Sequence, residues 1–182
     1  MRARKRDNRA QRSEAADNAG EGAKRKPSLA ATAVRMLARR EYGRAELTDR
    51  LVMRGASREE VDGVLDELER QGYLSDARFA HAVVAQKTGH YGKRAIAHAL
   101  REKRVAREAA ADALRALEGA DELALATALW QRRYGQPPRD ERDKARQVRF
   151  LLARGFSTSM ALKVLRAAGA RDAENDEGDT PT

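Results

Sequence analysis

The sequence contains no cysteine, so disulfide bonds, thiolate metal sites and cysteine nucleophiles are all excluded. Aromatic residues make up 4% of its 182 residues, and alanine supplies much of the 41% hydrophobic fraction. Alanine buries little surface, so we expect a thin core shared between helices. No apolar run approaches the roughly 18 residues that cross a bilayer, and no apolar segment follows the basic N-terminus as in a secretory signal. These absences favour a cytoplasmic protein without membrane contact.

Positive charge is in excess, with 37 Lys and Arg against 28 Asp and Glu, a net charge of +9. Residues 1–28 carry nine basic and four acidic residues without apolar periodicity, which predicts a disordered basic tail. Residues 169–182 carry one Arg against five acidic residues, which predicts a disordered acidic tail. The remaining +8 lies in 29–168 and is typical of a partner that is a polyanion or an acidic protein. Base composition of the genome is the alternative explanation for the arginine content.

Apolar residues recur with the 3.6-residue period of a helix in 29–41, 44–54 and 58–71, whereas no alternating strand pattern occurs. The stretch LVMRGAS, 51–57, predicts a helix end, a short turn and a helix start. Gly55 suits the left-handed residue that ends a helix, and Ser57 with Glu60 forms a capping box.

The same stretch recurs one hundred positions later as LLARGFS, 151–157, although Met160 replaces the capping glutamate. The dipeptide Tyr-Gly occurs three times, beginning at Tyr42, Tyr91 and Tyr134. These recurrences predict an all-α protein of three tandem three-helix repeats that form an elongated, curved, solenoid-like array. We place the repeats at 29–74, 75–118 and 119–168.

One such repeat is expected to need its neighbours to complete its core. The middle repeat departs from the turn pattern, since it has Arg104 at the glycine position and Ala106 at the cap position. Because a left-handed conformation is costly for arginine, we expect a different turn there.

No catalytic or metal-binding pattern stands out. The spacing of His81, His90 and His98 matches no metal motif, and these histidines are interpreted as surface or packing residues. The stretch GHYGKR, 89–94, lacks a preceding strand and is interpreted as a helix cap followed by a basic helix start. We therefore expect neither a cofactor nor a metal, and no enzymatic activity.

Arginines are arranged in stripes on two predicted helices. Arg139, Arg142, Arg146 and Arg149 fall on one side of the helix that begins near Asp140, with Val148 and Leu152 on the other. In the second repeat Arg94, His98 and Arg101 lie opposite Ile96 and Leu100. Such stripes suit phosphate or carboxylate groups, but a solvated helix face with internal charge pairs explains them equally well. Few aromatics accompany them, so any contact with DNA is expected to be driven by phosphates. We assign Phe79, Phe150 and Phe156 to the core.

Four ordered stretches resemble the RecX family of regulators of the RecA recombinase. They are RMLARREYGRAELTDRLVMRGASREEVDGVLDELERQGYL at 35–74, SDARFAHAVV at 75–84, YGKRAIAHALREKRV at 91–105 and VRFLLARGFSTSMALKVL at 148–165. The departures are Arg104, where the family usually has glycine, and the two charged tails.

The resemblance implies tandem three-helix repeats without a catalytic centre. It also implies a protein that binds the RecA–DNA filament and restrains its ATPase, strand-exchange and co-protease activities. We expect a monomer whose contacts with RecA or DNA include six basic residues. They are Arg94, Arg101, Arg142, Lys144, Arg146 and Arg149.

Two alternatives remain open at this level. The short turns at Gly55 and Gly155 are compatible with a helix-turn-helix regulator that binds DNA without RecA. A repeat scaffold for a different acidic protein is the other.

Overall fold

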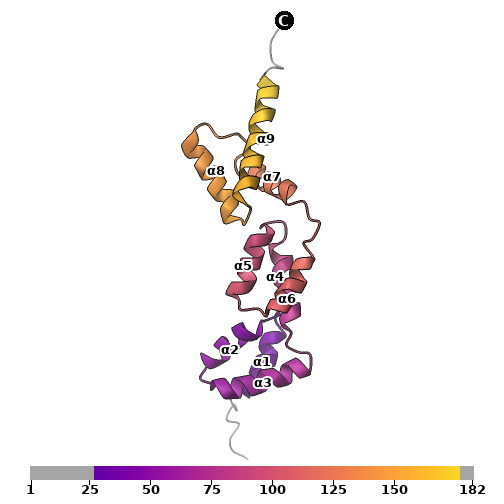
Figure 1. Cartoon of the computed structure of the whole chain (residues 1–182). Helices are drawn as coiled ribbons and strands as arrows, with labels where there is room; N and C mark the ends of the chain where they lie inside the picture. The colour runs from indigo at the N-terminus through magenta and orange to yellow at the C-terminus, as the bar shows by residue number, and fades with distance from the viewer. Residues whose placement is uncertain (1–26, 177–182) are drawn as a thin grey trace, which may run out of the picture.

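The structure is a computed structural model and describes residues 27–176, which form helices and no strands (Figure 1). The nine helices of this range are α1 Leu29–Leu37, α2 Arg44–Val52, α3 Arg58–Arg70, α4 Asp76–Lys87, α5 Lys93–Glu102, α6 Arg107–Arg115, α7 Glu122–Arg133, α8 Glu141–Ala153 and α9 Thr158–Asp176. They follow one another in three groups, stacked along one direction with α1 to α3 at one end and α7 to α9 at the other (Figure 1). We call these groups unit 1, unit 2 and unit 3. The predicted all-α, threefold architecture is confirmed.

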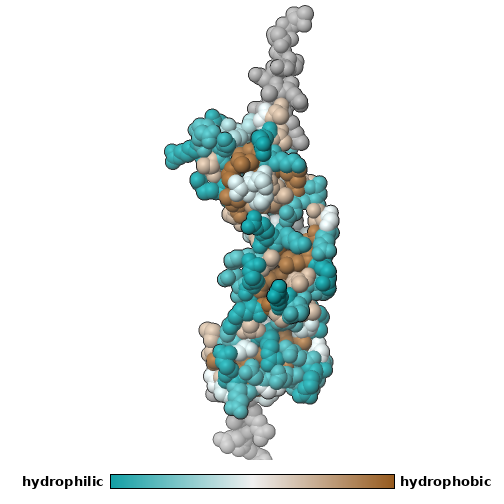
Figure 2. All heavy atoms as spheres, viewed as in Figure 1, coloured by the Kyte–Doolittle hydropathy of each residue, from teal (hydrophilic) through white to brown (hydrophobic). Residues whose placement is uncertain are grey.

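Each unit has its own hydrophobic core, which corrects the expectation of a core shared across units. Leu47, Leu51 and Leu65 are fully buried within unit 1, and the buried residues of units 2 and 3 form two further clusters. Each buried leucine contributes roughly 1.5–3 kcal/mol, so a unit draws its packing energy mainly from within. Figure 2 accordingly shows hydrophobic atoms in small separate patches on a mostly hydrophilic surface.

The turn between the second and third helix contains a left-handed residue in all three units. Gly55 and Gly155 have φ values of +95° and +89°, as the glycine pattern predicts. Arg104 has φ of 54°, so the expected departure in unit 2 is wrong. In each unit the N–H of the residue that follows the left-handed one donates to the carbonyl five residues back, as in Val105 N–H to Leu100 O at 3.1 Å. The Arg104 guanidinium offsets its backbone strain by bonding the Asp49 carboxylate and Ala45 carbonyl of unit 1.

Local capping follows the sequence closely at the third helices. The Ser57 hydroxyl accepts the Glu60 N–H at 3.2 Å, and the Glu60 carboxylate accepts the Ser57 N–H at 2.9 Å. This is the predicted capping box. In unit 3 only the first half remains, since Ser157 Oγ accepts the Met160 N–H at 3.2 Å.

The first two Tyr-Gly dipeptides, at Tyr42 and Tyr91, mark the joints between units. Gly43 and Gly92 precede α2 and α5 and offer no side chain to cap them. The next unit supplies a carboxylate instead: Arg44 N–H donates to Asp76 at 2.8 Å, and Lys93 N–H donates to Glu122 at 2.8 Å. A negative group at a helix N-terminus is stabilising. These two bonds therefore tie each unit to the one that follows it.

An aromatic ring seals each of the same joints. A Cβ atom at Gly43 would lie 2.8 Å from the Phe79 ring, and one at Gly92 would lie 3.1 Å from the Phe156 ring. Both rings are buried, as predicted, whereas Phe150 is half-buried with its ring in edge contact with Tyr134 at 5.5 Å. The two glycines are thus required by close approach of the neighbouring unit.

The C-terminal end of the stack is capped differently. Within residues 27–176 no further unit docks on the start of α8, whose own Asp140 accepts the Asp143 N–H at 2.6 Å. Beyond it, α9 continues to Asp176 and so includes residues 169–176 of the predicted acidic tail. Proline is absent from this stretch and alanine and arginine favour a helix. The predictions for residues 1–26 and 177–182 lie outside the described residues.

Candidate partner-binding surface

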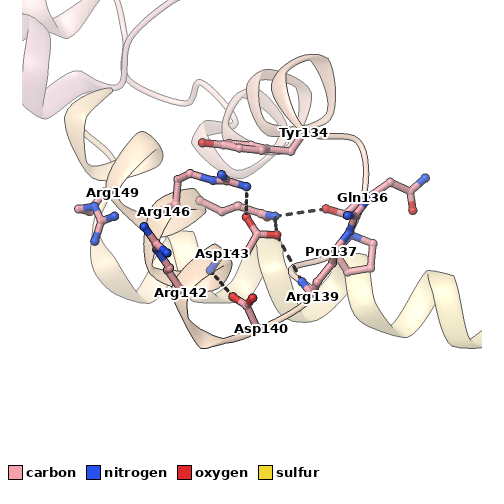
Figure 3. Close-up of a pocket in the computed structure, with 10 residues that line it drawn as sticks. Tyr134, Gln136, Pro137, Arg139, Asp140, Arg142, Asp143, Arg146 and Arg149 are labelled. Atoms are coloured by element: carbon pink, nitrogen blue, oxygen red, sulfur yellow. Dashed lines mark hydrogen bonds and ion pairs between the residues drawn. The ribbon is translucent and has the colours of Figure 1, made fainter.

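Arginines surround a hollow on unit 3. Arg142, Arg146 and Arg149 project from α8, and Arg139 lies in the loop before it (Figure 3). Their hollow has a volume of about 750 Å³. We call it the arginine hollow. Its other lining residues are Tyr134, Gln136, Pro137, Asp140, Asp143 and Gln147.

A buried glutamine holds the hollow in shape. Gln147 is 2% exposed and lies where units 1 and 2 have the aliphatic core residues Leu47 and Ile96. Its Oε1 accepts the Trp130 Nε1–H at 2.7 Å, and its Nε2 donates to Asp143 at 3.2 Å. The first bond ties α8 to α7, and the second, within α8, holds the amide in the orientation that this contact requires.

The Asp143 carboxylate accepts hydrogen bonds from several residues around the arginine hollow. It accepts the Arg139 N–H at 3.3 Å and the Arg146 guanidinium at 2.6 Å (Figure 3). Desolvation acts to raise the pKa of Asp143, but the bonds from Arg139, Arg146 and Gln147 together hold it below its ordinary value. The carboxylate therefore stays ionised and positions the loop that carries Arg139.

Positive charge in the hollow exceeds negative charge. Four guanidiniums face two carboxylates, Asp140 and Asp143, which leaves two positive charges in excess. Among the described residues, Arg142 and Arg149 have no ion-pair partner, whereas Arg146 pairs with Asp143. A guanidinium without a partner is available to bind phosphate or carboxylate bidentately.

The structure separates one predicted contact from the others. Lys144 lies on α8 but does not line the arginine hollow, and its Nζ is 3.1 Å from Glu141. Such an exposed pair contributes little to stability.

Arg94 and Arg101 lie beside a second hollow, at the joint between units 2 and 3. They line it together with His98 of α5 and with Leu152 and Phe156 of unit 3. The volume of this hollow is about 610 Å³. Leu152, which the helical wheel turns away from the arginine stripe, is 40% exposed here. Both hollows adjoin α8, and five of the six predicted contacts line one of them, Lys144 being the exception.

Tyr134 and Gln147 belong to the site although sequence reasoning did not assign them to it. Tyr134 was visible only as part of a repeated dipeptide. Gln147 could have been recognised as a polar residue at the register of Leu47 and Ile96, where an apolar one is expected.

Charge is distributed unevenly among the units. Residues 29–74 hold eight basic and nine acidic residues, a net charge of −1. Residues 75–118 hold nine and five, or +4, and residues 119–168 hold ten and five, or +5. The positive surface therefore belongs to units 2 and 3.

The described range, residues 27–176, also bears on metal binding and on membrane insertion. No group of three or more His, Asp or Glu residues in this range is placed to hold a metal ion. None of the helices described is both long enough and apolar enough to span a membrane.

These features define a class of protein: an all-helical array of three-helix units with cationic hollows toward one end. Comparison with protein families matches three successive domains: the first three-helix domain of RecX at 31–68, the second at 75–114 and the third at 120–165. The chain belongs to the RecX family.

Individual relatives are similar in sequence over most of the chain. The regulatory protein RecX of Ralstonia nicotianae is 40% identical over 154 residues, which cover 85% of this chain and 94% of the relative. The regulatory protein RecX of Leptothrix cholodnii is 42% identical over 153 residues, with 84% and 95% covered. A crystal structure of RecX from Lactobacillus salivarius has a TM-score of 0.62 at 18% identity and covers 78% of this chain and 95% of its own. This last similarity concerns the fold alone.

Proposed function

We propose that the chain is a non-catalytic modulator of RecA that binds the RecA–DNA filament and restrains its ATPase, strand-exchange and co-protease activities. Membership of the RecX family over all three units is the observation that carries this proposal. The relatives are named regulatory proteins. We further propose that it acts in the cytoplasm and as a monomer.

The geometry supplies a means of binding a polyanionic filament. Cationic hollows on units 2 and 3 follow one another along the stack, and the bond from the Lys93 N–H to Glu122 ties these two units together. We propose that Arg142, Arg146 and Arg149 contact the filament, with Arg94 and Arg101 beside them and Lys144 in a peripheral role. Phosphate contacts of this kind release counterions, so binding weakens as salt rises.

Reversal of the three α8 charges tests the proposal. Arg142→Glu, Arg146→Glu and Arg149→Glu together are expected to weaken binding to RecA filaments on single-stranded DNA roughly tenfold or more. The same variant should lose inhibition of DNA-dependent ATP hydrolysis by RecA and should show a shallower salt dependence.

A control of equal charge change comes from the same unit. Arg132→Glu, Lys163→Glu and Arg166→Glu alter exposed residues of α7 and α9 outside the arginine hollow. Equal losses of filament affinity in both triple variants would show that net charge, and not the arginine hollow, determines binding. A wild-type chain that leaves RecA hydrolysis unchanged would refute the function itself, and tight sequence-selective binding to duplex DNA without RecA would replace it with the helix-turn-helix alternative.

A further inference from the structure

Unit 1 has an apolar groove at the opposite end of the stack. It lies between α1 and α3, has a volume of about 830 Å³ and exposes Val34, which is 36% accessible. Leu29, Ala56, Val64 and Leu68 also line it. We call it the α1/α3 groove.

The equivalent positions in the other two units hold polar side chains. Counting six residues from the caps Ser28, Ser75 and Asp121 places Val34, His81 and Thr127 at one position of the first helix. The facing position of the third helix holds Gly63 in unit 1, Asp112 in unit 2 and Lys163 in unit 3. The first pair leaves the groove open and apolar.

The polar pairs act differently in the other two units. In unit 2 the His81 Nε2 lies 3.0 Å from the Asp112 carboxylate and bridges the two helices. In unit 3 Thr127 and Lys163 line a hollow with Gln131. Unit 1 therefore differs from both of its copies in having no polar side chain at either position.

Gly63 has no packing role within the described chain. It lies in the interior of α3, where glycine lowers helix stability relative to alanine. A Cβ atom there would meet nothing within 4 Å. Space at this position instead allows the backbone of another element to come close to α3.

The charge at the groove selects the kind of partner. Glu59, Glu60 and Glu67 line it, and no lysine or arginine does. Residues 29–74 carry −1 in total, whereas units 2 and 3 are positive. A cationic segment is therefore attracted to this end of the stack and repelled from the other.

We infer that the α1/α3 groove docks an amphipathic helix of RecA, with apolar side chains facing Val34 and Gly63 and with Lys or Arg side chains beside the three glutamates. The groove runs along α3, whose 13 residues span about 20 Å, enough for roughly three to four turns of a second helix. This inference rests on the proposed function, since RecA supplies the helix. It gives the chain two separate contacts with the filament, one for protein and one for phosphate.

The absence of cysteine allows a direct test in the full-length chain. Val34→Cys, Arg149→Cys and Met53→Cys each provide a single thiol for a benzophenone photocross-linker. Met53 is a matched control because it is an apolar residue of unit 1 that is 87% exposed and does not line the groove. After irradiation with RecA filaments, we expect the Val34 probe to join RecA within a helix that carries Lys or Arg, and the Met53 probe to give little product.

The outcomes separate this inference from the proposed function. Cross-linking from Arg149 without cross-linking from Val34 would overturn the inference and leave the proposed function standing. Absence of cross-linking to RecA from both Val34 and Arg149 would overturn the inference and the proposed function together. A product within the same chain or between two copies would assign the groove to residues 1–26 or to a dimer, and would also overturn the inference.

A substitution that fills the groove provides a second test. Gly63→Gln should leave the thermal unfolding midpoint unchanged or higher, because it removes a glycine from a helix interior. It should weaken filament binding about fivefold or more while affinity for naked single-stranded DNA changes less than about twofold. Unchanged filament affinity would contradict the inference.

Discussion

Units 1 and 3 share one frame but present different surfaces. Both have a left-handed glycine after the second helix and a serine cap before the third. Yet unit 1 carries −1 and an apolar groove, whereas unit 3 carries +5 and an arginine hollow. The residues that determine helix ends have stayed alike while those between the helices have diverged. Repetition in this chain therefore specifies shape, and binding chemistry is assigned unit by unit.

Equivalent glycines give the largest expected contrast between the two units. A Cβ atom at Gly155 would lie 2.5 Å from Ala95 of unit 2, but one at Gly55 would meet nothing within 4 Å. Gly155→Ala is expected to lower the free energy of unfolding by about 2–5 kcal/mol, through left-handed strain plus overpacking. Gly55→Ala should cost only the strain, about 1–2 kcal/mol. Urea unfolding measures both, and equal losses would mean that the joint between units 2 and 3 adds nothing.

The buried glutamine of unit 3 gives an intermediate effect. Gln147→Leu restores the residue type of Leu47 but leaves the Trp130 N–H without an acceptor, so the free energy of unfolding should fall by about 1–3 kcal/mol. Adding Trp130→Phe removes the unsatisfied donor and should recover part of that loss. A double-mutant cycle from urea unfolding checks the coupling. Additive losses would show that the bond contributes no specific energy.

The acid response of Asp143 is the smallest effect. Because bonds in the folded state hold the pKa of Asp143 below its ordinary value of 3.8, its contribution is present above that pH and is lost as the pH falls further. Asp143→Asn should therefore destabilise the protein more at pH 7 than at pH 3, measured by urea midpoints. The comparator in unit 1 is Glu60, whose pKa is lowered chiefly by the Ser57 N–H bond. A Glu60→Gln variant should show the same trend with pH, and a larger effect at pH 3 in either variant would contradict this assignment.

Sequence reasoning reached the helices, the glycine turn and the capping box because each depends on a few neighbouring residues. The turn at Arg104 was mispredicted because the compensating groups, Asp49 and Ala45, are more than fifty positions away. The joints were missed for the same reason, since the carboxylates of Asp76 and Glu122 bond helices of the preceding unit. Local signals predict where helices begin and end, but not which distant side chain completes them.

The candidate site shows the same limit. The spacing of the arginines predicted a stripe on α8, and the structure places Arg142, Arg146 and Arg149 around one hollow. Their role as contacts stays a prediction. The role of Gln147 in the hollow could not be predicted from the sequence, because it depends on a hydrogen bond from Trp130 of another helix. Lys144 lies outside the hollow and pairs with Glu141, and a helical wheel does not predict this ion pair.

The Asp140 cap has a consequence for the length of the array. A fourth unit grafted after unit 3 would present its first acidic helix to an N-terminus that already holds Asp140, Glu141 and Asp143. Like charges there would oppose docking, whereas the first turn of α5 has no acidic residue and that of α2 has one, Glu46. Local chemistry at this helix start thus disfavours the docking of a further unit on α8, and an engineered longer version would first need a glycine in place of Asp140.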